Sequence, residues 1–264
     1  MKRIQLFEFE DFNWFPDVFR RNMTKLIVVF NKLLKLDEVV AESLKPILEK
    51  QNANLIVDLG SGAGGIMPHV HSELVKEKNN LQLTLSDLHP NREQIEAFAS
   101  SPNVNYFSES LNATSLATSP AGVKTMVNCF HHMPLPVAKS ILKSAQESKQ
   151  TLCIYELTNK PLPLIVWWLF LPIGLTIVFL STLILTPFTK PITWQQLVFT
   201  YIIPIIPLAY AWDGQASMPR TYTKTDLETL VSELPNDPNY SWKYEVGKTK
   251  GGKSTGYCFV GQPK

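Results

Sequence analysis

A short apolar segment that runs into a glycine-rich turn constrains this 264-residue chain more than any other feature. The segment LIVDL carries an acid, Asp58, near its end, and the turn GSGAGG follows it over residues 60–65. A continuous apolar run of this length, ended by glycine, is typical of a buried parallel strand. Parallel strands need helical crossovers between them, so the chain is expected to be an α/β protein.

Further apolar runs alternate with amphipathic segments after this turn. Strands are expected at 81–87, 103–107, 125–130 and 151–157, with helices over 65–77, 92–100 and 137–148. This spacing predicts a Rossmann-like, doubly wound parallel sheet. Near the C-terminus, a helix in TYTKTDLETLVSEL precedes SWKYEVG and GYCFVG, which are expected to form an antiparallel β-hairpin.

The composition changes between residues 161 and 212, where Lys190 is the single charged residue. Residues 164–185 are 22 uncharged, mostly apolar residues, close to the ~20 that cross a hydrocarbon core as a helix. Residues 192–212 are a weaker candidate, because prolines interrupt them. We expect an inserted hydrophobic helical hairpin that contacts the membrane; spanning and re-entrant arrangements both fit, and a buried hairpin in a soluble lid is the alternative.

The chain is therefore expected to have four parts. They are an N-terminal helical flank (1–54), a Rossmann-like core (55–160), the membrane-associated hairpin (161–212) and a C-terminal helix and β-hairpin that complete the core (213–264). Lysines before the insertion favour the cytoplasmic side for the core. Three cysteines without a metal-binding pair, and an N-terminus without a secretory pattern, fit a reduced, cytoplasmic setting.

Charge and histidine spacing argue against two classes of ligand. The formal net charge is +2, and no basic run suggests a groove for nucleic acid. His69, His71 and His89 have no spacing typical of metal ligands, so no metal is expected.

The glycine turn itself allows two ligands. Gly60, Gly62 and Gly65 satisfy the G-x-G-x-x-G pattern, and Asp87 follows about 20 residues later, as in dinucleotide-binding proteins. Asp58 would repel a pyrophosphate at the next helix N-terminus, but it would favour an ammonium or sulfonium group. Asp58 therefore favours a cationic ligand.

The stretch VDLGSGAGG resembles motif I of class I S-adenosylmethionine-dependent methyltransferases, and Asp87, which closes LTLSD, matches that family's ribose-binding acid. The resemblance implies S-adenosylmethionine as the cofactor and an antiparallel strand pair added to the sheet. The cofactor-binding residues that it implies are Asp58, Gly60, Ser61, Gly62, Gly64, Asp87, Leu88, Asn112, Ala113 and Phe130. Asn112 replaces the aspartate that is commoner in the family, but its amide can still hydrogen-bond a base edge. The chain is more loosely similar to bacterial methyltransferase-like proteins with an apolar insertion before WDG and RTY segments.

Catalytic candidates follow from the expected sheet, because ligands of open α/β sheets lie beyond the carboxyl ends of the strands. His131 and His132 follow the fourth strand, and Glu156 ends the fifth. Histidine suits the removal of a proton from a methyl acceptor. Because adjacent strand residues point to opposite faces, one of the two histidines is expected to reach the substrate.

The residues after the insertion are candidates for the acceptor pocket. Tyr222 is the third catalytic candidate, and with Asp213 and Arg220 it is expected either to line that pocket or to anchor the insertion. A membrane hairpin beside the site predicts a small, lipophilic methyl acceptor that arrives from membrane lipid. A nucleotide-dependent oxidoreductase and a non-catalytic membrane scaffold are the alternatives.

Overall fold

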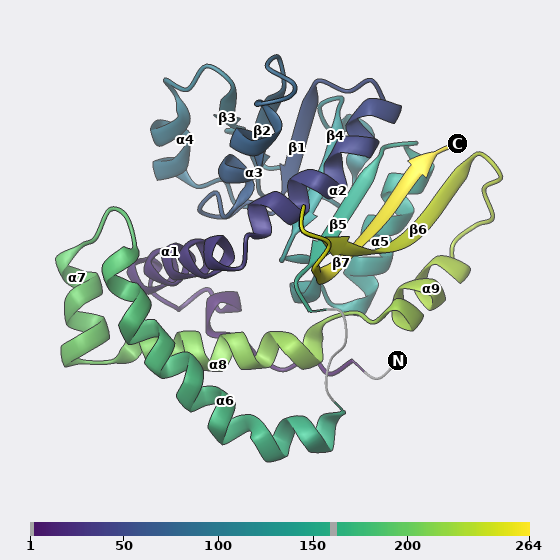
Figure 1. The fold of residues 1–264 in the computed structure, drawn as a ribbon. Helices are drawn as coiled ribbons and strands as arrows, with labels where there is room; N and C mark the ends of the chain where they lie inside the picture. The colour runs from purple at the N-terminus through teal and green to yellow at the C-terminus, as the bar shows by residue number, and fades with distance from the viewer. Residues whose placement is uncertain (1–2, 159–162) are drawn as a thin grey trace. The chain divides into compact units, whose positions relative to one another are not determined.

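The structure is a computed structural model that describes residues 3–158 and 163–264 (Figure 1). The chain forms two compact units. The sheet unit consists of the described residues of 35–159 and 222–264, and the helical unit consists of those of 1–34 and 160–221.

A seven-stranded sheet in the order β3-β2-β1-β4-β5-β7-β6 is the centre of the sheet unit. Its strands are β1 (Leu55–Leu59), β2 (Gln82–Ser86), β3 (Val104–Tyr106), β4 (Val123–Val127), β5 (Leu152–Glu156), β6 (Tyr240–Lys248) and β7 (Ser254–Pro263). The first five strands are parallel, and β7 is antiparallel to both β5 and β6. The predicted parallel sheet with a C-terminal antiparallel hairpin is confirmed.

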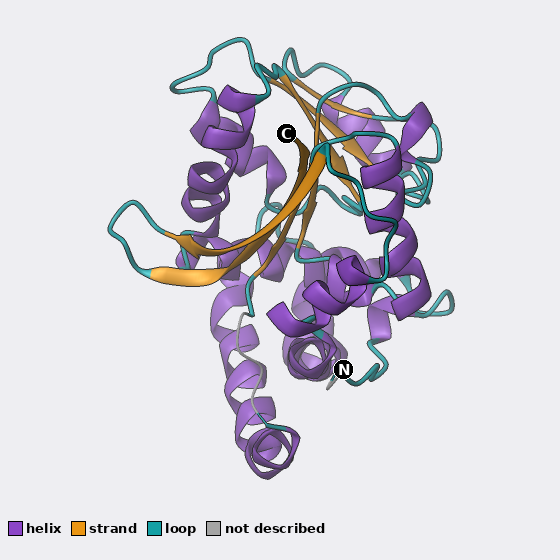
Figure 2. Cartoon of the chain, turned by 90° about the vertical axis from the view of Figure 1, so that its right-hand side faces the viewer, coloured by secondary structure: helices purple, strands orange, loops and turns teal. Residues whose placement is uncertain are grey.

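Helices cover both faces of this sheet (Figure 2). One face packs against α2 (Leu36–Lys50), α3 (Met67–Leu74) and α4 (Arg92–Phe98). The other packs against α5 (Leu135–Glu147) and α9 (Lys224–Ser232). All five residues of β5 are buried, as expected for a strand with a helical layer on each side. The doubly wound architecture is therefore confirmed, and the carboxyl ends of β1, β2, β4 and β5 share one edge.

The helical unit contains the apolar insertion. Its helices are α1 (Asp17–Leu33), α6 (Leu164–Leu185), α7 (Trp194–Leu197), the π-helical turn η5 (Val198–Ile202) and α8 (Ile205–Arg220), with the 3₁₀ turns η1 (Phe9–Asp11) and η4 (Thr186–Phe188). Residues Leu164–Phe188 are long and apolar enough to cross a membrane, and the α7–η5 segment meets α8 at a bend of 79°. A helix inserted after β5 is thus present, as predicted.

The insertion ends later than the sequence indicates, since α8 continues past residue 212 to Arg220. Asp213 accepts hydrogen bonds from the backbone nitrogens of Phe9 at 2.7 Å and Glu10 at 3.2 Å. Arg220 is fully buried, and its guanidinium lies 3.2 Å from Glu8. In the sequence, Asp213 and Arg220 suggest the end of the apolar segment. In the structure both residues lie inside α8, where residues of the N-terminal segment form hydrogen bonds and an ion pair with them.

The two N-terminal helices belong to different units, although the sequence suggests one flank over 1–54. Helix α1 packs through Met23 and Leu26 on Leu185 and Ile206. Helix α2 packs instead on the sheet. Lys35, between the two helices, has a left-handed backbone with φ of 54°, so the helical conformation is interrupted where the two units meet in the sequence.

Candidate active site

Asp58 lies in β1 at the carboxyl-terminal edge of the sheet and is 4% exposed. Ser61 Oγ donates to Asp58 Oδ2 at 2.6 Å, and Thr125 Oγ1 of β4 donates to Asp58 Oδ1 at 2.7 Å. Burial raises the pKa of Asp58 to about 7, although the two hydroxyl donors act in the opposite direction. The site therefore contains a carboxyl group that titrates near neutral pH.

The glycine turn after β1 has backbone conformations that disfavour side chains. Gly62 has φ of +51°, and a Cβ built on it would meet no atom within 4 Å, so the turn faces open space there. Gly60 has φ of +71°, and its Cβ would lie 3.5 Å from Cys129 Sγ. The Gly64 nitrogen donates to the Ser61 carbonyl at 2.7 Å, which closes the turn. The result is an exposed backbone surface at the start of α3.

Asp87 follows β2 directly and lies against this turn. Its carboxylate accepts hydrogen bonds from the Gly62 nitrogen at 2.9 Å and the His89 nitrogen at 2.9 Å. A carboxylate has about four acceptor positions, so two backbone donors leave capacity for the hydroxyls of a ligand. Tyr106 of β3 donates its hydroxyl to the Gly62 carbonyl at 2.9 Å, and burial raises the pKa of that hydroxyl. The turn is thus held from two neighbouring strands.

The loop after β3 joins the loop after β2. The Leu111 nitrogen donates to the Asp87 carbonyl at 3.0 Å, and Ser110 Oγ donates to the Leu88 carbonyl at 2.7 Å. Leu88 is about half exposed, and Ala113 packs beside the core of the second sheet face. These bonds bring the predicted residues Leu88, Asn112 and Ala113 to the same region as Asp87.

Asn112 is exposed, and its side-chain oxygen accepts from both the nitrogen and the hydroxyl of Thr114, at 2.9 and 2.8 Å. This local turn orients the amide. The amide nitrogen is then the group that Asn112 can offer to a ligand.

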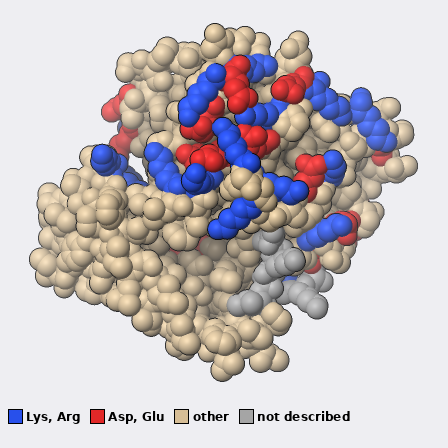
Figure 3. Space-filling model, viewed as in Figure 1, with Lys and Arg blue, Asp and Glu red and all other residues tan. Residues whose placement is uncertain are grey.

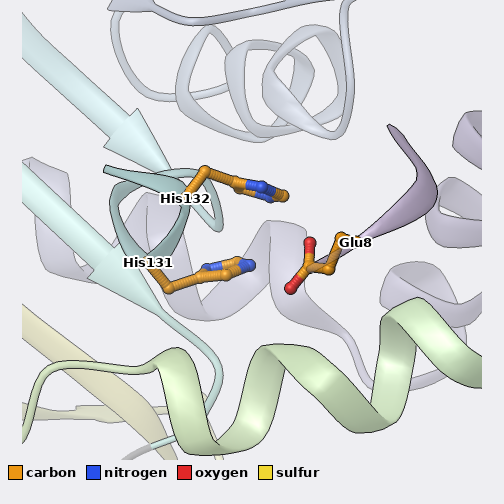
Figure 4. Close-up of side chains that lie close together, drawn as sticks. All are labelled: Glu8, His131 and His132. Carbon is orange, nitrogen blue, oxygen red and sulfur yellow. The ribbon is translucent and has the colours of Figure 1, made fainter. Parts of the chain in front are cut away.

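The two histidines lie on the 3₁₀ turn η3 (Phe130–His132), which follows β4. Figure 4 shows both imidazole rings extending to the same side of this turn, and their centroids are 4.3 Å apart. The expectation that adjacent residues point to opposite faces is wrong here, because β4 ends at Val127 and the predicted strand over 125–130 is too long. Asn128, the residue after β4, has a left-handed backbone with φ of 53°. Its side-chain Oδ1 accepts a hydrogen bond from the Leu157 nitrogen at 2.9 Å.

Glu156, the last residue of β5, fixes His131. The His131 nitrogen donates to Glu156 Oε1 at 3.0 Å, and His131 Nδ1 lies 2.8 Å from Glu156 Oε2. Both side chains are less than a tenth exposed, whereas His132 is half-buried. A buried carboxylate bonded to Nδ1 fixes the orientation of an imidazole ring.

Phe130, on the turn that carries the two histidines, packs against Tyr222. Both side chains are fully buried, and their rings pack with centroids 5.2 Å apart. The Tyr222 hydroxyl donates to the Met133 carbonyl at 2.8 Å. The geometry gives the two rings a packing role that supports η3.

Three contacts lie outside what the sequence reveals: Thr125 on Asp58, Tyr106 on the Gly62 carbonyl, and Glu156 on His131. In each contact at least one of the two residues belongs to a strand, and its partner comes from another strand or from the turn that follows one, so the contact depends on how the strands align. In the structure Asp58 is directly opposite Thr125 across the β1–β4 pair. Cys129 is a further residue that the sequence does not single out; burial raises the pKa of its thiol, so it remains protonated at neutral pH beside Gly60.

The carboxylates at this edge of the sheet suit a ligand that carries a diol and a positively charged group. Asp87 offers hydrogen-bond acceptor positions for a diol. A cation near Asp58 would favour the ionised form of its carboxyl group. The backbone at Gly62 leaves room for the ligand itself.

The fold is similar to that of known methyltransferases. No family model matches the chain, and no curated protein matches it in sequence. The plantazolicin methyltransferase BamL, solved with a triazolic desmethylPZN analog and SAH, is 12% identical with a TM-score of 0.52, over 94% of this chain and 99% of that one. The methyltransferase domain of bacterial CtHen1 is 16% identical with a TM-score of 0.49, over 86% and 99% of the two chains. Human N-acetylserotonin methyltransferase, solved with SAM, is 12% identical with a TM-score of 0.44, over 86% and 51%.

Proposed function

We propose that this protein is an S-adenosylmethionine-dependent methyltransferase that associates with a membrane and methylates a small, lipophilic acceptor. The observation that carries the proposal is the pair of carboxylates at the ends of β1 and β2, Asp58 and Asp87, which flank a glycine turn with open space beside it. The similarity of fold to BamL supports the same class of reaction.

The predicted cofactor residues have a place in this proposal, except Phe130, which is fully buried and packs on Tyr222. Asp87 accepts the ribose hydroxyls, and the exposed Leu88 lies beside the adenine with Asn112 and Ala113. The glycine backbone and Ser61 form the surface against the amino-acid part, and the Asp58 carboxylate favours its positive charge. When bound, S-adenosylmethionine supplies a methyl group on a sulfonium that leaves as a neutral thioether.

A dinucleotide oxidoreductase fits this site less well. Asp87 would suit the ribose of a nicotinamide cofactor equally, so it does not discriminate. A pyrophosphate would gain no attraction from the protonated Asp58 and would be repelled by its ionised form, whereas a cationic group would be attracted by the ionised form. The two classes are therefore separated by the charge of the group that binds near Asp58.

The histidine pair supplies the acid–base chemistry. An acceptor hydroxyl must lose its proton as its oxygen forms the bond to the methyl carbon. Because Glu156 bonds to His131 Nδ1, proton transfer is assigned to His131 Nε2, and His132 contributes a second imidazole packed against the first. The packed Tyr222 supports η3 from below and acts as a positioning residue.

The helical unit supports membrane association. In the face drawn in Figure 3, the surface of α6, α7 and α8 is almost without charged residues. Large apolar side chains on α6 are strongly exposed, including Ile165 at 83% and Leu169 at 71%. Exposed apolar surface of this extent is costly in water and marks contact with a membrane or a partner. An acceptor dissolved in lipid is the substrate class that suits such a surface, with the sheet unit on the cytoplasmic side.

Calorimetric titration of detergent-solubilised protein with S-adenosylmethionine, its demethylated product and NADH tests the cofactor. Micromolar binding of the two adenosyl ligands and none of NADH is expected. Asp87→Asn is the matched variant, because it keeps one carbonyl acceptor and loses the charge. Binding of NADH alone, or of none of the three, contradicts the proposal.

The acceptor is tested with S-adenosylmethionine labelled in its methyl group. Label is expected in organic-soluble products when the protein is incubated with membrane lipid extract. Label that appears exclusively in soluble proteins or nucleic acids contradicts the lipophilic acceptor.

A further inference from the structure

We infer that the helical unit is embedded in one leaflet, with α6 lying along the membrane surface instead of crossing the bilayer. The inference rests on the proposed membrane association and specifies its geometry. In this arrangement lipid hydrocarbon covers the exposed apolar face of α6.

That face is continuous along the whole helix. We call it the outer stripe, and its residues recur every three or four positions: Ile165, Leu169, Ile173, Ile177, Leu180 and Ile184. All six are apolar and at least half exposed. The spacing places them on one side of the helix, so the stripe extends from the first turn of α6 to the last.

The opposite face of α6 packs on α8, and the first half of that contact is polar. Trp167 Nε1 donates to the Gln215 carbonyl at 3.2 Å, and the Gln215 side chain lies so close to Gly174 that a Cβ there would be 2.6 Å from Gln215 Oε1. Asp213 and the buried Arg220 lie on the same segment of α8. In a spanning arrangement this ionic segment would enter the hydrocarbon of the near leaflet, where charged groups are costly.

The second half of α6 has a charged neighbour as well. Helix α1 packs there through Met23 and Leu26 on Leu185, and it carries five charged residues over Asp17–Lys32. Lys25 Nζ donates to the Pro191 carbonyl at 2.8 Å, just past the end of α6. A spanning α6 would carry α1 into the far leaflet with these charges.

The path of the chain leads to the same conclusion. From Lys25, which contacts Pro191 just past the end of α6, to Lys32, near the end of α1, the helix rises about 10 Å, whereas the 22 residues of α6 rise about 33 Å. A spanning α6 would therefore keep Lys32 within or beyond the far leaflet, where a charged side chain is costly. With α6 parallel to the surface, the outer stripe meets hydrocarbon and the charged residues of α1 and α8 stay at the headgroups.

Lysine substitutions along the outer stripe distinguish the two orientations. Ile165→Lys, Ile173→Lys and Ile184→Lys lie at one depth if α6 is flat, so each is expected to reduce flotation of the protein with vesicles of mixed neutral and anionic phospholipid by the same factor, within about threefold. The matching alanine variants are the controls, since they remove bulk without adding charge. A large loss for Ile173→Lys with tolerance at both ends would be the pattern of a spanning helix and would overturn the inference.

Side-specific labelling gives an independent test in sealed membrane vesicles of known orientation. Lys190→Cys, at the far end of α6, and Lys250→Cys, in the exposed β6–β7 turn of the sheet unit, are treated with a membrane-impermeant maleimide, with the wild-type chain as background. Labelling of both from the same face is expected. Labelling of Lys190→Cys from the opposite face, or from neither, contradicts the in-plane orientation. A protein that does not fractionate with the vesicles refutes membrane association as well, while the calorimetric binding of S-adenosylmethionine remains a separate result.

Discussion

Binding of S-adenosylmethionine should be coupled to the loss of a proton from Asp58. Burial raises the pKa of this carboxyl to about 7 in the ligand-free protein. A sulfonium or ammonium group nearby favours the ionised carboxylate, so the bound state should have Asp58 deprotonated. Protons and cofactor therefore compete, and acid should weaken binding.

The magnitude follows from the pKa. For a group with pKa about 7 that must ionise on binding, the apparent Kd rises by a factor of 1 + 10^(pKa − pH), about 1.1 at pH 8 and about 11 at pH 6. The expected loss of affinity from pH 8 to pH 6 is thus about tenfold, or ~1.4 kcal/mol. Asp58→Asn cannot ionise, so its weaker binding should be independent of pH over this interval.

Calorimetry at pH 6 and pH 8, in pairs of buffers with different ionisation enthalpies, measures both the Kd and the number of protons released. Release of close to one proton per cofactor at pH 6 is expected for the wild type, and none for Asp58→Asn. Asp87→Asn is the control, since it should bind more weakly but retain the pH dependence. A wild-type Kd equal at the two pH values, without proton release, would refute the coupling and the placement of a cationic group beside Asp58.

Three further results are expected. Because the folded-state pKa of Asp58 is about 7 and its ordinary value is 3.8, the contribution of Asp58 to the free energy of unfolding of the ligand-free protein should be present in full below about pH 4 and fall by about 3 kcal/mol from pH 4 to pH 7. In chemical denaturation at each pH, the difference in this free energy between the wild type and Asp58→Asn should change by that amount. Glu156→Gln should lower kcat by roughly 10²-fold or more with little change in the Kd of S-adenosylmethionine, and an unchanged kcat in a labelled-methyl assay would remove His131 as the base. Gly62→Ala should destabilise the turn by about 1 kcal/mol through its positive φ and weaken cofactor binding, whereas wild-type affinity would show that no ligand approaches this backbone.

The sequence predicts the sheet well because short segments rich in apolar residues, such as LIVDL in β1 and LCIYE in β5, alternate with amphipathic helical segments. It also locates Asp58 and Asp87, since both positions follow from where a strand ends. The histidine pair is different: its geometry depends on a strand that stops at Val127, because Asn128 adopts a left-handed conformation that no local pattern requires. Likewise, the bond between Glu156 and His131 depends on the alignment of β4 with β5.

The end of the insertion is another limit of sequence-based prediction. Asp213 and Arg220 resemble the polar boundary of an apolar segment, yet they belong to α8. Their partners are residues near the N-terminus, about 200 positions away in the chain: the Phe9 nitrogen donates a hydrogen bond to Asp213, and Glu8 forms an ion pair with Arg220. Pairing over such a distance cannot be inferred from composition.

The helical unit is assembled from the two distant segments that flank the first part of the sheet unit, and this has a consequence for synthesis. Helix α1 leaves the ribosome early, but Leu185 and Ile206, on which its Met23 and Leu26 pack, follow some 160 to 180 residues later. At roughly 5–20 residues per second, the apolar side of α1 waits on the order of ten seconds or more for its partners. During that interval the apolar side of α1, including Met23 and Leu26, has no packing partner and is open to solvent, to a chaperone or to other apolar segments of the nascent chain.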